Sequence, residues 1–486
     1  MHRKPSKKQL LAQRMITFTA TVLSVAVIVT GTLFLLLGYR LDGADGQLEQ
    51  GALVQFNSRP SGAQVTIDGV ETGSQTATKR SLLAGEHSFM MSKDGYRPWT
   101  RTLKLEAGTL TWLDYIRLVP MELAKQTLQS FKNVADVEAA PDNQTIVIQQ
   151  DASSPTFDVI DIRAQDVSST VVQLPSDLLT DVSRHEVTHR YTMDSWDPDG
   201  RYLLVQHQYG DEREWLVFDT ENVTASRNIT RLLRINLSDV QFASTNGNVL
   251  YGLSDGVIRK LDLQNATLSR SLVDNVVSFT MYGTSVLTYV GKNDQNQQVV
   301  GLYRDGDELP HILRTVSDPK VRLQVDTARY YSNDYVALSQ GNEVTILAGR
   351  YPSSAQTDAS SLTELTSFTA DTDVDQLTFS PDGAYVLARS GLTFSTYELE
   401  YDWLHHERID TTEEPIQHLQ WLDDAHLVTS YDGHLTMRDF DGTNVNVIMP
   451  IVAGTDATLS QNGRYIYAVN KTDDSFRLER VTMVLD

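Results

Sequence analysis

The string His185-Glu186-Val187-Thr188-His189 combines the residue types and the spacing of a zinc-peptidase site. In the H-E-x-x-H pattern, a helix places both histidines on one face, so that their side chains converge on a zinc ion and the glutamate lies beside the bound water. On a strand, which rises ~3.3 Å per residue, the same histidines lie roughly 13 Å apart. A zinc ion with bonds of about 2.0–2.1 Å to each histidine cannot bridge that distance. The secondary structure of this segment therefore decides whether metal chemistry is available.

Local patterning favours a strand over a helix here. Residues 187–194 alternate with period two and run directly into the turn "DPDG" at 197–200. The helical alternative has a cap at Ser176 and an apolar stripe over 178–182. We expect the strand, because the alternation continues through the second histidine.

The extended peptidase motif also lacks its third ligand. Its glycine and histidine positions hold Thr192 and Ser195. A downstream acid such as Glu212 or Glu214 would follow the next hairpin. We therefore predict no metal site and no cofactor, and interpret as a chance match the three candidate ligands His185, Glu186 and His189.

Other chemistry-bearing groups are equally incomplete. Asp371, Asp373 and Asp375 have the spacing of calcium ligands, but the glycine position of the EF-hand loop holds glutamine, so we interpret them as a solvated loop before a strand. The adjacent pair His405-His406 cannot converge on one ion and is interpreted as loop or edge. The sequence contains no G-x-S-x-G elbow, phosphate loop or G-x-G-x-x-G motif. These observations predict a protein that is not an enzyme.

Charge separates the N-terminus from the rest of the chain. The net formal charge is −22 over 486 residues. Residues 1–40 carry six Lys or Arg and no acid, which leaves 35 basic against 63 acidic side chains in the remainder. A surface this negative repels nucleic acid, so we predict no nucleic-acid partner. The chain has no cysteine, which excludes disulfides, thiolate zinc sites and a lipoprotein anchor.

One apolar run is long enough to cross a membrane. Residues 16–38 contain 23 positions without a charge, which span a hydrocarbon core of ~30 Å as a tilted helix. Basic residues precede the run, and this predicts a cytoplasmic N-terminus. A cleaved signal peptide is the alternative, but the run is longer than usual and no A-x-A-like site follows it. We predict a single-pass cell-membrane protein with a basic tail (1–14), a membrane span (15–39) and a linker (40–50), and with the bulk of the chain outside the cytoplasm.

Residues 51–120 predict a small all-β module. Apolar and polar residues alternate around turns such as Asp68-Gly69 and Asp94-Gly95. The segment resembles the PEGA domain, through Pro60-Ser61-Gly62-Ala63, "VTIDG" (65–69), Leu82 to His87, and Gly95-Tyr96. Ser61 stands where that family has glutamate, at a turn position. The resemblance implies an extracytoplasmic β-sandwich without catalytic residues, and His87 is interpreted as a strand residue.

The remaining sequence, 121–486, repeats with a period of about 46 residues. The strongest copies are "SWDPDGRYLLV" (195–205), "TFSPDGAYVLA" (378–388) and "TLSQNGRYIYA" (458–468). Related turns lie near 142, 246, 283, 333 and 424. This period is typical of four-stranded propeller blades, which bury both sheet faces by radial stacking. The turns favour eight blades, with 121–131 supplying the strand that closes the last one. Seven blades with an insertion is the alternative.

The Asp-Gly turns resemble the blade motif of TolB-type and WD40-like propellers, which implies the fold but no particular partner. The combined fold prediction is a mainly β protein with one N-terminal transmembrane helix, a PEGA-like sandwich and a C-terminal β-propeller. We predict a membrane-tethered binding or scaffold protein that recognises a protein or cell-wall partner. The alternatives are a zinc hydrolase acting through residues 185–189, a glycan-acting propeller with paired carboxylates across the central channel, and a structural spacer.

Overall fold

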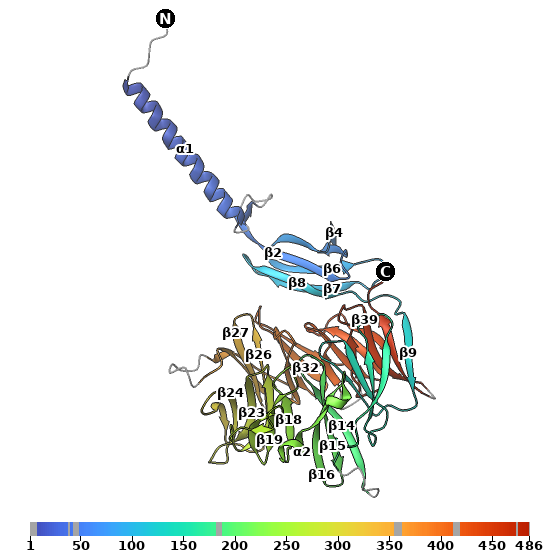
Figure 1. Cartoon of the computed structure of the whole chain (residues 1–486). Coiled ribbons are helices and arrows are strands. Elements are labelled where there is room, and N and C mark those ends of the chain that lie inside the picture. The colour runs from blue at the N-terminus through green and yellow to red at the C-terminus, as the bar shows by residue number, and fades with distance from the viewer. Residues whose placement is uncertain are drawn as a thin grey trace. The chain divides into compact units, whose positions relative to one another are not determined.

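The N-terminal apolar run forms a continuous helix, α1 (Lys7–Leu36) (Figure 1). The computed structural model describes residues 7–36, 39–41, 48–180, 187–353, 362–411, 418–472 and 475–485. Within α1, Arg14–Leu33 is long and apolar enough to cross a membrane, with a mean hydropathy of 2.0, and its side chains are exposed. The hydroxyls of Thr21, Ser24 and Thr32 each donate to the carbonyl four residues earlier. This bonding satisfies them inside an apolar surface.

The chain divides into two compact units, Met1–Glu122 and Leu123–Asp486. The first unit adds two four-stranded sheets to α1, in the orders β1-β2-β5 with β8 beside β2, and β4-β3-β6-β7. Their strands are β1 (Tyr39–Leu41), β2 (Leu48–Arg59), β3 (Gln64–Ile67), β4 (Val70–Gln75), β5 (Thr78–Leu83), β6 (Gly85–Ser92), β7 (Trp99–Leu105) and β8 (Leu110–Arg117).

The predicted alternation of the small module is confirmed. The apolar residues that were expected to share one face are buried, namely Val54, Phe56, Val65, Ile67, Phe89, Met91, Leu103 and Leu105. His87 lies on β6, as expected, and its Nδ1 is 2.7 Å from Oδ2 of Asp68. Asp68 adopts a left-handed backbone (φ 51°) at the Asp-Gly turn. The imidazole therefore supports a turn within the module.

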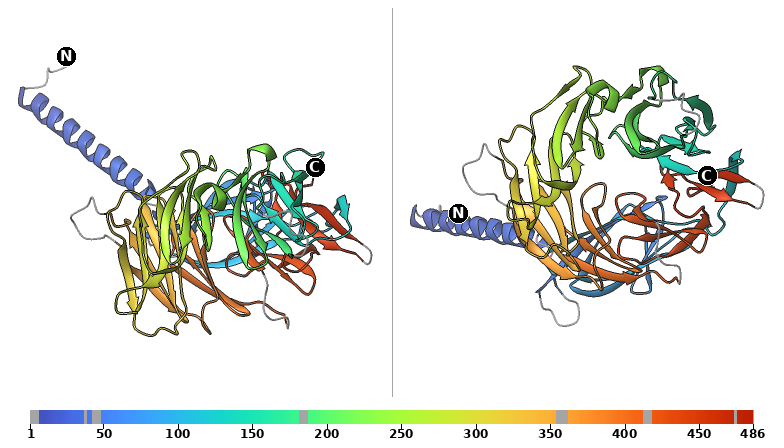
Figure 2. Two further views of the ribbon diagram at one scale, coloured as in Figure 1. Left: turned by 60° about the horizontal axis from the view of Figure 1, so that its bottom comes forward. Right: turned by 90° about the horizontal axis from the view of Figure 1, so that it is seen from below.

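The second unit is a β-propeller built from four-stranded antiparallel sheets, of which the described residues form eight (Figure 2). We number them I to VIII in chain order. Sheets I to IV comprise β10 (Asp136–Ala139), β11 (Thr145–Gln149), β12 (Thr156–Asp161), β13 (Ser168–Gln173); β14 (His189–Trp196), β15 (Tyr202–Tyr209), β16 (Glu212–Asp219), β17 (Arg227–Asn228); β18 (Asp239–Phe242), β19 (Val249–Ser254), β20 (Val257–Asp262), β21 (Thr267–Leu268); and β22 (Val276–Tyr282), β23 (Val286–Lys292), β24 (Gln298–Arg304), β25 (His311–Val316).

The later sheets follow the same plan. Sheets V to VIII comprise β26 (Leu323–Tyr330), β27 (Asn333–Gln340), β28 (Glu343–Gly349), β29 (Thr363–Thr369); β30 (Gln376–Phe379), β31 (Tyr385–Ser390), β32 (Thr393–Glu398), β33 (Trp403–Arg408); β34 (His418–Trp421), β35 (His426–Tyr431), β36 (His434–Asp439), β37 (Asn446–Pro450); and β38 (Thr458–Leu459), β39 (Tyr465–Lys471), β40 (Phe476–Thr482) with β9 (Lys125–Phe131). Two short helices, η1 (Val223–Ala225) and α2 (Ile229–Leu233), interrupt sheet II and were not predicted.

The repeated turns connect the first and second strands of every sheet, as the period predicts. In the stronger copies, a side-chain oxygen before the turn accepts the backbone N–H five residues later. Asp197 accepts from Tyr202 at 2.6 Å, Ser380 from Tyr385 at 3.0 Å and Ser460 from Tyr465 at 2.9 Å. The following glycine is required at some turns: Gly383 has a φ of 79°, and a side chain there would meet the carbonyl oxygen of Arg329 at 2.9 Å. These bonds explain why Asp, Ser and Gly recur.

Chain ends close the propeller. Strand β9, from the start of the unit, pairs antiparallel with β40 from its end, so that Phe131 lies opposite Phe476. The prediction that 121–131 supplies the missing strand is confirmed. A cluster of buried residues then joins sheet VIII to sheet I, including Phe131, Ile146 and Tyr467. The two ends of the unit are therefore hydrogen bonded within sheet VIII, and apolar packing joins that sheet to sheet I.

Candidate functional site

His189 begins strand β14, as the period-two pattern predicts. His185 and Glu186, the other two candidate ligands, lie outside the described residues. Within the described ranges, no group of three His, Asp or Glu side chains is placed to hold a metal ion.

A hydrogen-bonded chain contains His189. Its Nδ1 lies 2.9 Å from Nε2 of His207, and Nδ1 of His207 lies 2.8 Å from Oε1 of Glu214. The ring of Tyr191 stacks on His207 with centroids 4.2 Å apart. A carboxylate only accepts, so His207 donates from Nδ1; in the neutral ring, Nε2 then accepts from Nδ1 of His189. The two tautomers follow from this single constraint.

Glu214 is the buried end of this chain. It also accepts from Thr180 N at 2.9 Å and from Asn228 Nδ2 at 2.6 Å. Burial raises the pKa of Glu214, but the bonds from His207, Thr180 and Asn228 outweigh burial and hold the pKa below its usual value. The hairpin between β15 and β16 returns Glu214 opposite His207, a pairing that the sequence does not reveal.

The remaining sequence candidates are separated from one another. Asp375 binds Arg389 through Oδ1 at 2.5 Å and accepts from Gly391 N. Asp371 lies 3.5 Å from Nε2 of His406, whose Nδ1 is 3.0 Å from Ser395 Oγ. These contacts tie the loop before sheet VI to strands of that sheet.

A cavity of about 510 Å³ opens between the repeated turns of sheets I, VI and VII and residues 456–458, where sheet VIII begins. Because consecutive strands are antiparallel, all the turns between first and second strands lie at one edge of the sheets. We call this edge the turn face and the cavity the channel mouth. The main lining residues are Pro141, Pro381, Trp421, Asp423, Asp424 and Asp456. Its walls thus combine an indole with several carboxylates.

Trp421 is the aromatic wall of the channel mouth. Its Nε1 is buried and has no hydrogen-bond partner among the described residues. Asp423 is instead committed to its own turn, accepting from the backbone and Nδ1 of His426.

Acidic side chains continue from the mouth along the first strands of the sheets. Burial raises the pKa of Glu138 to about 9, with Asp456, Asp136 and Asp194 adding to the shift. Burial and Asp194 raise the pKa of Asp239 to about 6. A desolvated carboxyl group near other acids keeps its proton to higher pH, and Glu138 is therefore protonated near pH 7 unless a cation binds. This side of the channel therefore favours positive charge.

Neutral side chains replace these acids on other sheets. Gln241, the third residue of β18, donates to Phe279 O at 2.8 Å and accepts from Met281 N at 2.7 Å. Gln420, the third residue of β34, donates to Ala457 O at 2.9 Å. Glu138 is the third residue of β10. At the third position of the first strand, sheets III and VII thus carry a glutamine that bonds to the neighbouring sheet, whereas sheet I carries a glutamate.

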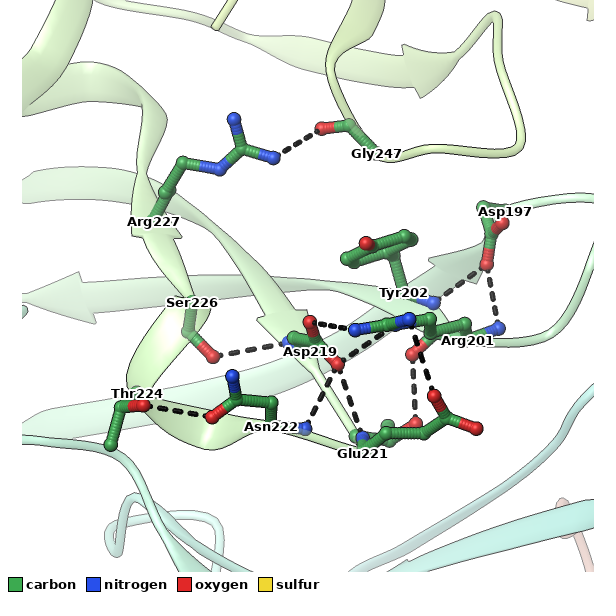
Figure 3. A network of polar contacts seen from close by, with 11 residues as sticks. Asp197, Arg201, Tyr202, Asp219, Glu221, Asn222, Thr224, Ser226, Arg227 and Gly247 are labelled. Atoms are coloured by element: carbon green, nitrogen blue, oxygen red, sulfur yellow. Dashed lines mark hydrogen bonds and ion pairs between the residues drawn. The ribbon is translucent and has the colours of Figure 1, made fainter. Parts of the chain in front are cut away.

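Sheet II carries a polar network on the same turn face (Figure 3). Arg201 binds Asp219 through Nε at 3.1 Å and Nη2 at 2.8 Å, and its Nη1 lies 3.3 Å from Glu221. The fully buried Asp197 accepts from the backbone N–H groups of Arg201 and Tyr202. Although a groove of about 440 Å³ runs beside it, the guanidinium is held by carboxylates. We interpret this network as support for the turn.

Comparison with known proteins adds a family for the small module. Residues 52–120 match the family model described as PEGA domain, which confirms the resemblance. A search of curated proteins gives no match. Similar solved structures include "Oligogalacturonate lyase in complex with manganese" (TM-score 0.39, 10% identity, covering 74% of this chain and 98% of that chain). A second is "Kluyveromyces lactis Hsv2 complete loop 6CD" (TM-score 0.40, 13% identity, covering 72% of this chain and 98% of that chain). A third is a chain of "Crystal Structure of Mitotic Checkpoint Complex" (TM-score 0.34, 10% identity, covering 75% of this chain and 92% of that chain).

Proposed function

We propose that this chain is a binding protein of the cell envelope, anchored by α1 with its N-terminus in the cytoplasm and its propeller outside. The apolar helix, the PEGA domain and the propeller support a membrane-anchored protein that presents a binding surface. Basic residues on the N-terminal side of the span support this orientation. In this proposal the PEGA domain (51–120) joins the anchor to the propeller (121–486).

The channel mouth is the proposed binding site. The observation that carries the proposal is the cavity of about 510 Å³, which places Trp421 with Asp424 and Asp456 at one end of the propeller. Carboxylates attract a cationic group by charge, and an indole ring does so through its negative face. A lysine, arginine or amine of an envelope partner matches this chemistry. Concave sites with an aromatic wall and few polar groups are the usual form of ligand pockets.

Co-sedimentation of the full-length chain, in detergent, with isolated cell envelopes tests the proposal. Asp424 is exposed on the turn face, whereas Asp211 is exposed on the β15–β16 hairpin at the opposite edge. Asp424→Lys should lower envelope binding about tenfold or more, because it reverses one charge at the cavity. Asp211→Lys makes the same charge change and should bind as the wild type does. Equal binding by both variants would reject the channel mouth, and no wild-type binding would reject the function.

A further inference from the structure

An aromatic platform lies on the turn face away from the channel mouth, where sheets V and VI meet. Tyr331 follows β26, and its side chain is 77% exposed. Its ring lies against that of Tyr330, with centroids 4.4 Å apart. Tyr401, in the turn between β32 and β33, and Trp403, the first residue of β33, stack their rings with centroids 5.0 Å apart. We call these four side chains and Glu400 the platform.

One hydrogen bond joins the two halves of the platform. The hydroxyl of Tyr330 donates to Oε2 of Glu400 at 2.9 Å. Burial, Tyr331 and Glu400 all raise the pKa of Tyr330, so the hydroxyl stays protonated and remains a donor. Glu400 itself is exposed and keeps further acceptor capacity, since a carboxylate has about four lone-pair sites.

The fold holds the platform in place. Tyr397 donates its hydroxyl to Asp402 Oδ1 at 2.7 Å, which fixes the turn that carries Tyr401 and Trp403. Gly383 allows the neighbouring turn to approach Arg329 O, directly before Tyr330. Tyr331 adopts a left-handed backbone (φ 50°), which is unfavourable for a large aromatic residue. An exposed tyrosine at a strained position contributes no core packing, and strained positions cluster where residues bind ligands.

Flat aromatic faces next to a carboxylate match the chemistry of a sugar. The C–H groups on one face of a pyranose ring carry partial positive charge and pack on the negative face of an aromatic ring. The hydroxyl and acetamido N–H groups at the ring edge donate to a carboxylate. The excess of acidic side chains outside residues 1–40 repels polyanions. A neutral glycan is therefore expected to bind more tightly than an acidic one.

The surroundings favour a glycan over a protein partner. Protein hot spots lie in pockets ringed by residues that exclude water. The platform instead lies on turns, and its own Glu400 and the neighbouring Asp402 are exposed to water. We propose that Tyr330, Tyr331, Glu400, Tyr401 and Trp403 bind a neutral glycan of the cell envelope. This inference rests on the proposed envelope-binding function and names the ligand class for a second position on the same face.

Titration of the full-length chain, in detergent, with a soluble chitin oligosaccharide tests the glycan proposal, with tryptophan fluorescence and calorimetry as readouts. Wild type should bind, and an acidic alginate oligosaccharide should not. Tyr331→Ala and Trp403→Ala should each weaken binding about tenfold, and Glu400→Gln several-fold. Leu309→Ala is the matched control, because Leu309 is 71% exposed on another turn of the propeller. The melting temperature of Tyr331→Ala should stay near that of wild type, since the ring is exposed and alanine keeps the same Cβ at this backbone position.

Two outcomes would overturn the glycan proposal. The first is no binding of the chitin oligosaccharide by wild type, and the second is an equal loss in Leu309→Ala and Tyr331→Ala. Envelope co-sedimentation that still depends on Asp424 would then show that the proposed function stands without the glycan. A third outcome would show that the platform recognises a protein instead. In that case Tyr331→Ala weakens co-sedimentation with intact envelopes, and protease treatment of the envelopes abolishes binding of wild type. Glycan binding by wild type, together with envelope co-sedimentation that does not depend on Asp424, would reject the channel mouth alone.

Discussion

Nδ1 of His207 lies 2.8 Å from Oε1 of Glu214, and neither side chain reaches solvent. A buried carboxylate is stable only while its hydrogen-bond donors remain, because removing one partner leaves charge without compensation. His207→Ala should therefore lower the free energy of unfolding of the propeller by about 3 kcal/mol. Urea denaturation followed by tryptophan fluorescence measures this change. A loss below about 1 kcal/mol would show that the pair contributes little.

The same pair predicts a pH dependence. Glu214 has a folded-state pKa below its usual value of 4.5, so its contribution to stability is fully present above that value and is lost as pH falls through the folded pKa. Glu214→Gln should destabilise the protein at pH 7, and the difference from wild type should shrink under acid. Unfolding curves across this range test the sign. Glu212→Gln, an exposed change at the start of the same strand, should show no such trend.

Glu138 predicts the opposite pH dependence. Its folded-state pKa of about 9 lies above its usual value of 4.5, so its contribution to stability is greatest below pH 4.5 and declines as pH rises towards 9. Glu138→Gln removes the titration and supplies the residue that links first strands at Gln241 and Gln420. We expect this variant to exceed wild type by about 1 kcal/mol or more at pH 8, and to match it near pH 4. A variant less stable than wild type at pH 8 would contradict this account.

Closure of the propeller by β9 can be tested with a disulfide, because the chain has no cysteine of its own. Ser130 and Arg477 are cross-strand partners in β9 and β40. Cysteines at both positions should raise the free energy of unfolding by about 2–4 kcal/mol when oxidised, since the bridge closes a very long loop. Reduction should remove the gain. A bridge between Val159 and Thr170, partners within sheet I, closes a short loop and should stabilise less.

A close contact in sheet IV predicts a steric effect. Gly301 lies opposite Tyr289 on the neighbouring strand, and a methyl group on Gly301 would overlap the phenol ring. Gly301→Ala should cost about 1–3 kcal/mol, because the buried Tyr289 has no space to move into. Gly306→Ala meets no atom within 4 Å, so any cost there arises from its positive φ alone. Thermal unfolding should rank Gly301→Ala as the less stable variant.

Local patterns predicted the turns and the strand at His189, because each depends on residues close together in the chain. The closing strand β9 was predicted instead from the repeat, because the last copy lacks a fourth strand. The HExxH string shows where such reasoning stops. It correctly indicated a strand at His189. The partner of His189, His207, lies on the next strand, and local periodicity does not determine which residues pair across strands.

The platform and the channel mouth were harder to predict for a related reason. Tyr330 and Glu400 belong to different sheets, and their hydrogen bond depends on how those sheets stack. Trp421 and Asp456 likewise come from different repeats. Aromatic residues at turns were visible in the sequence, but exposure distinguishes Tyr331 from the buried Tyr385 at a comparable turn. Only the assembled structure gives that distinction.

The pairing of β9 with β40 has a consequence for biosynthesis. Of the propeller strands, β9 is synthesised first and β40 last. The backbone groups of β9 therefore lack their partner strand until nearly the whole polypeptide has emerged from the ribosome. A product truncated by a premature stop codon would leave that edge exposed to proteases and to other chains. Cells would thus retain full-length molecules and degrade shortened ones.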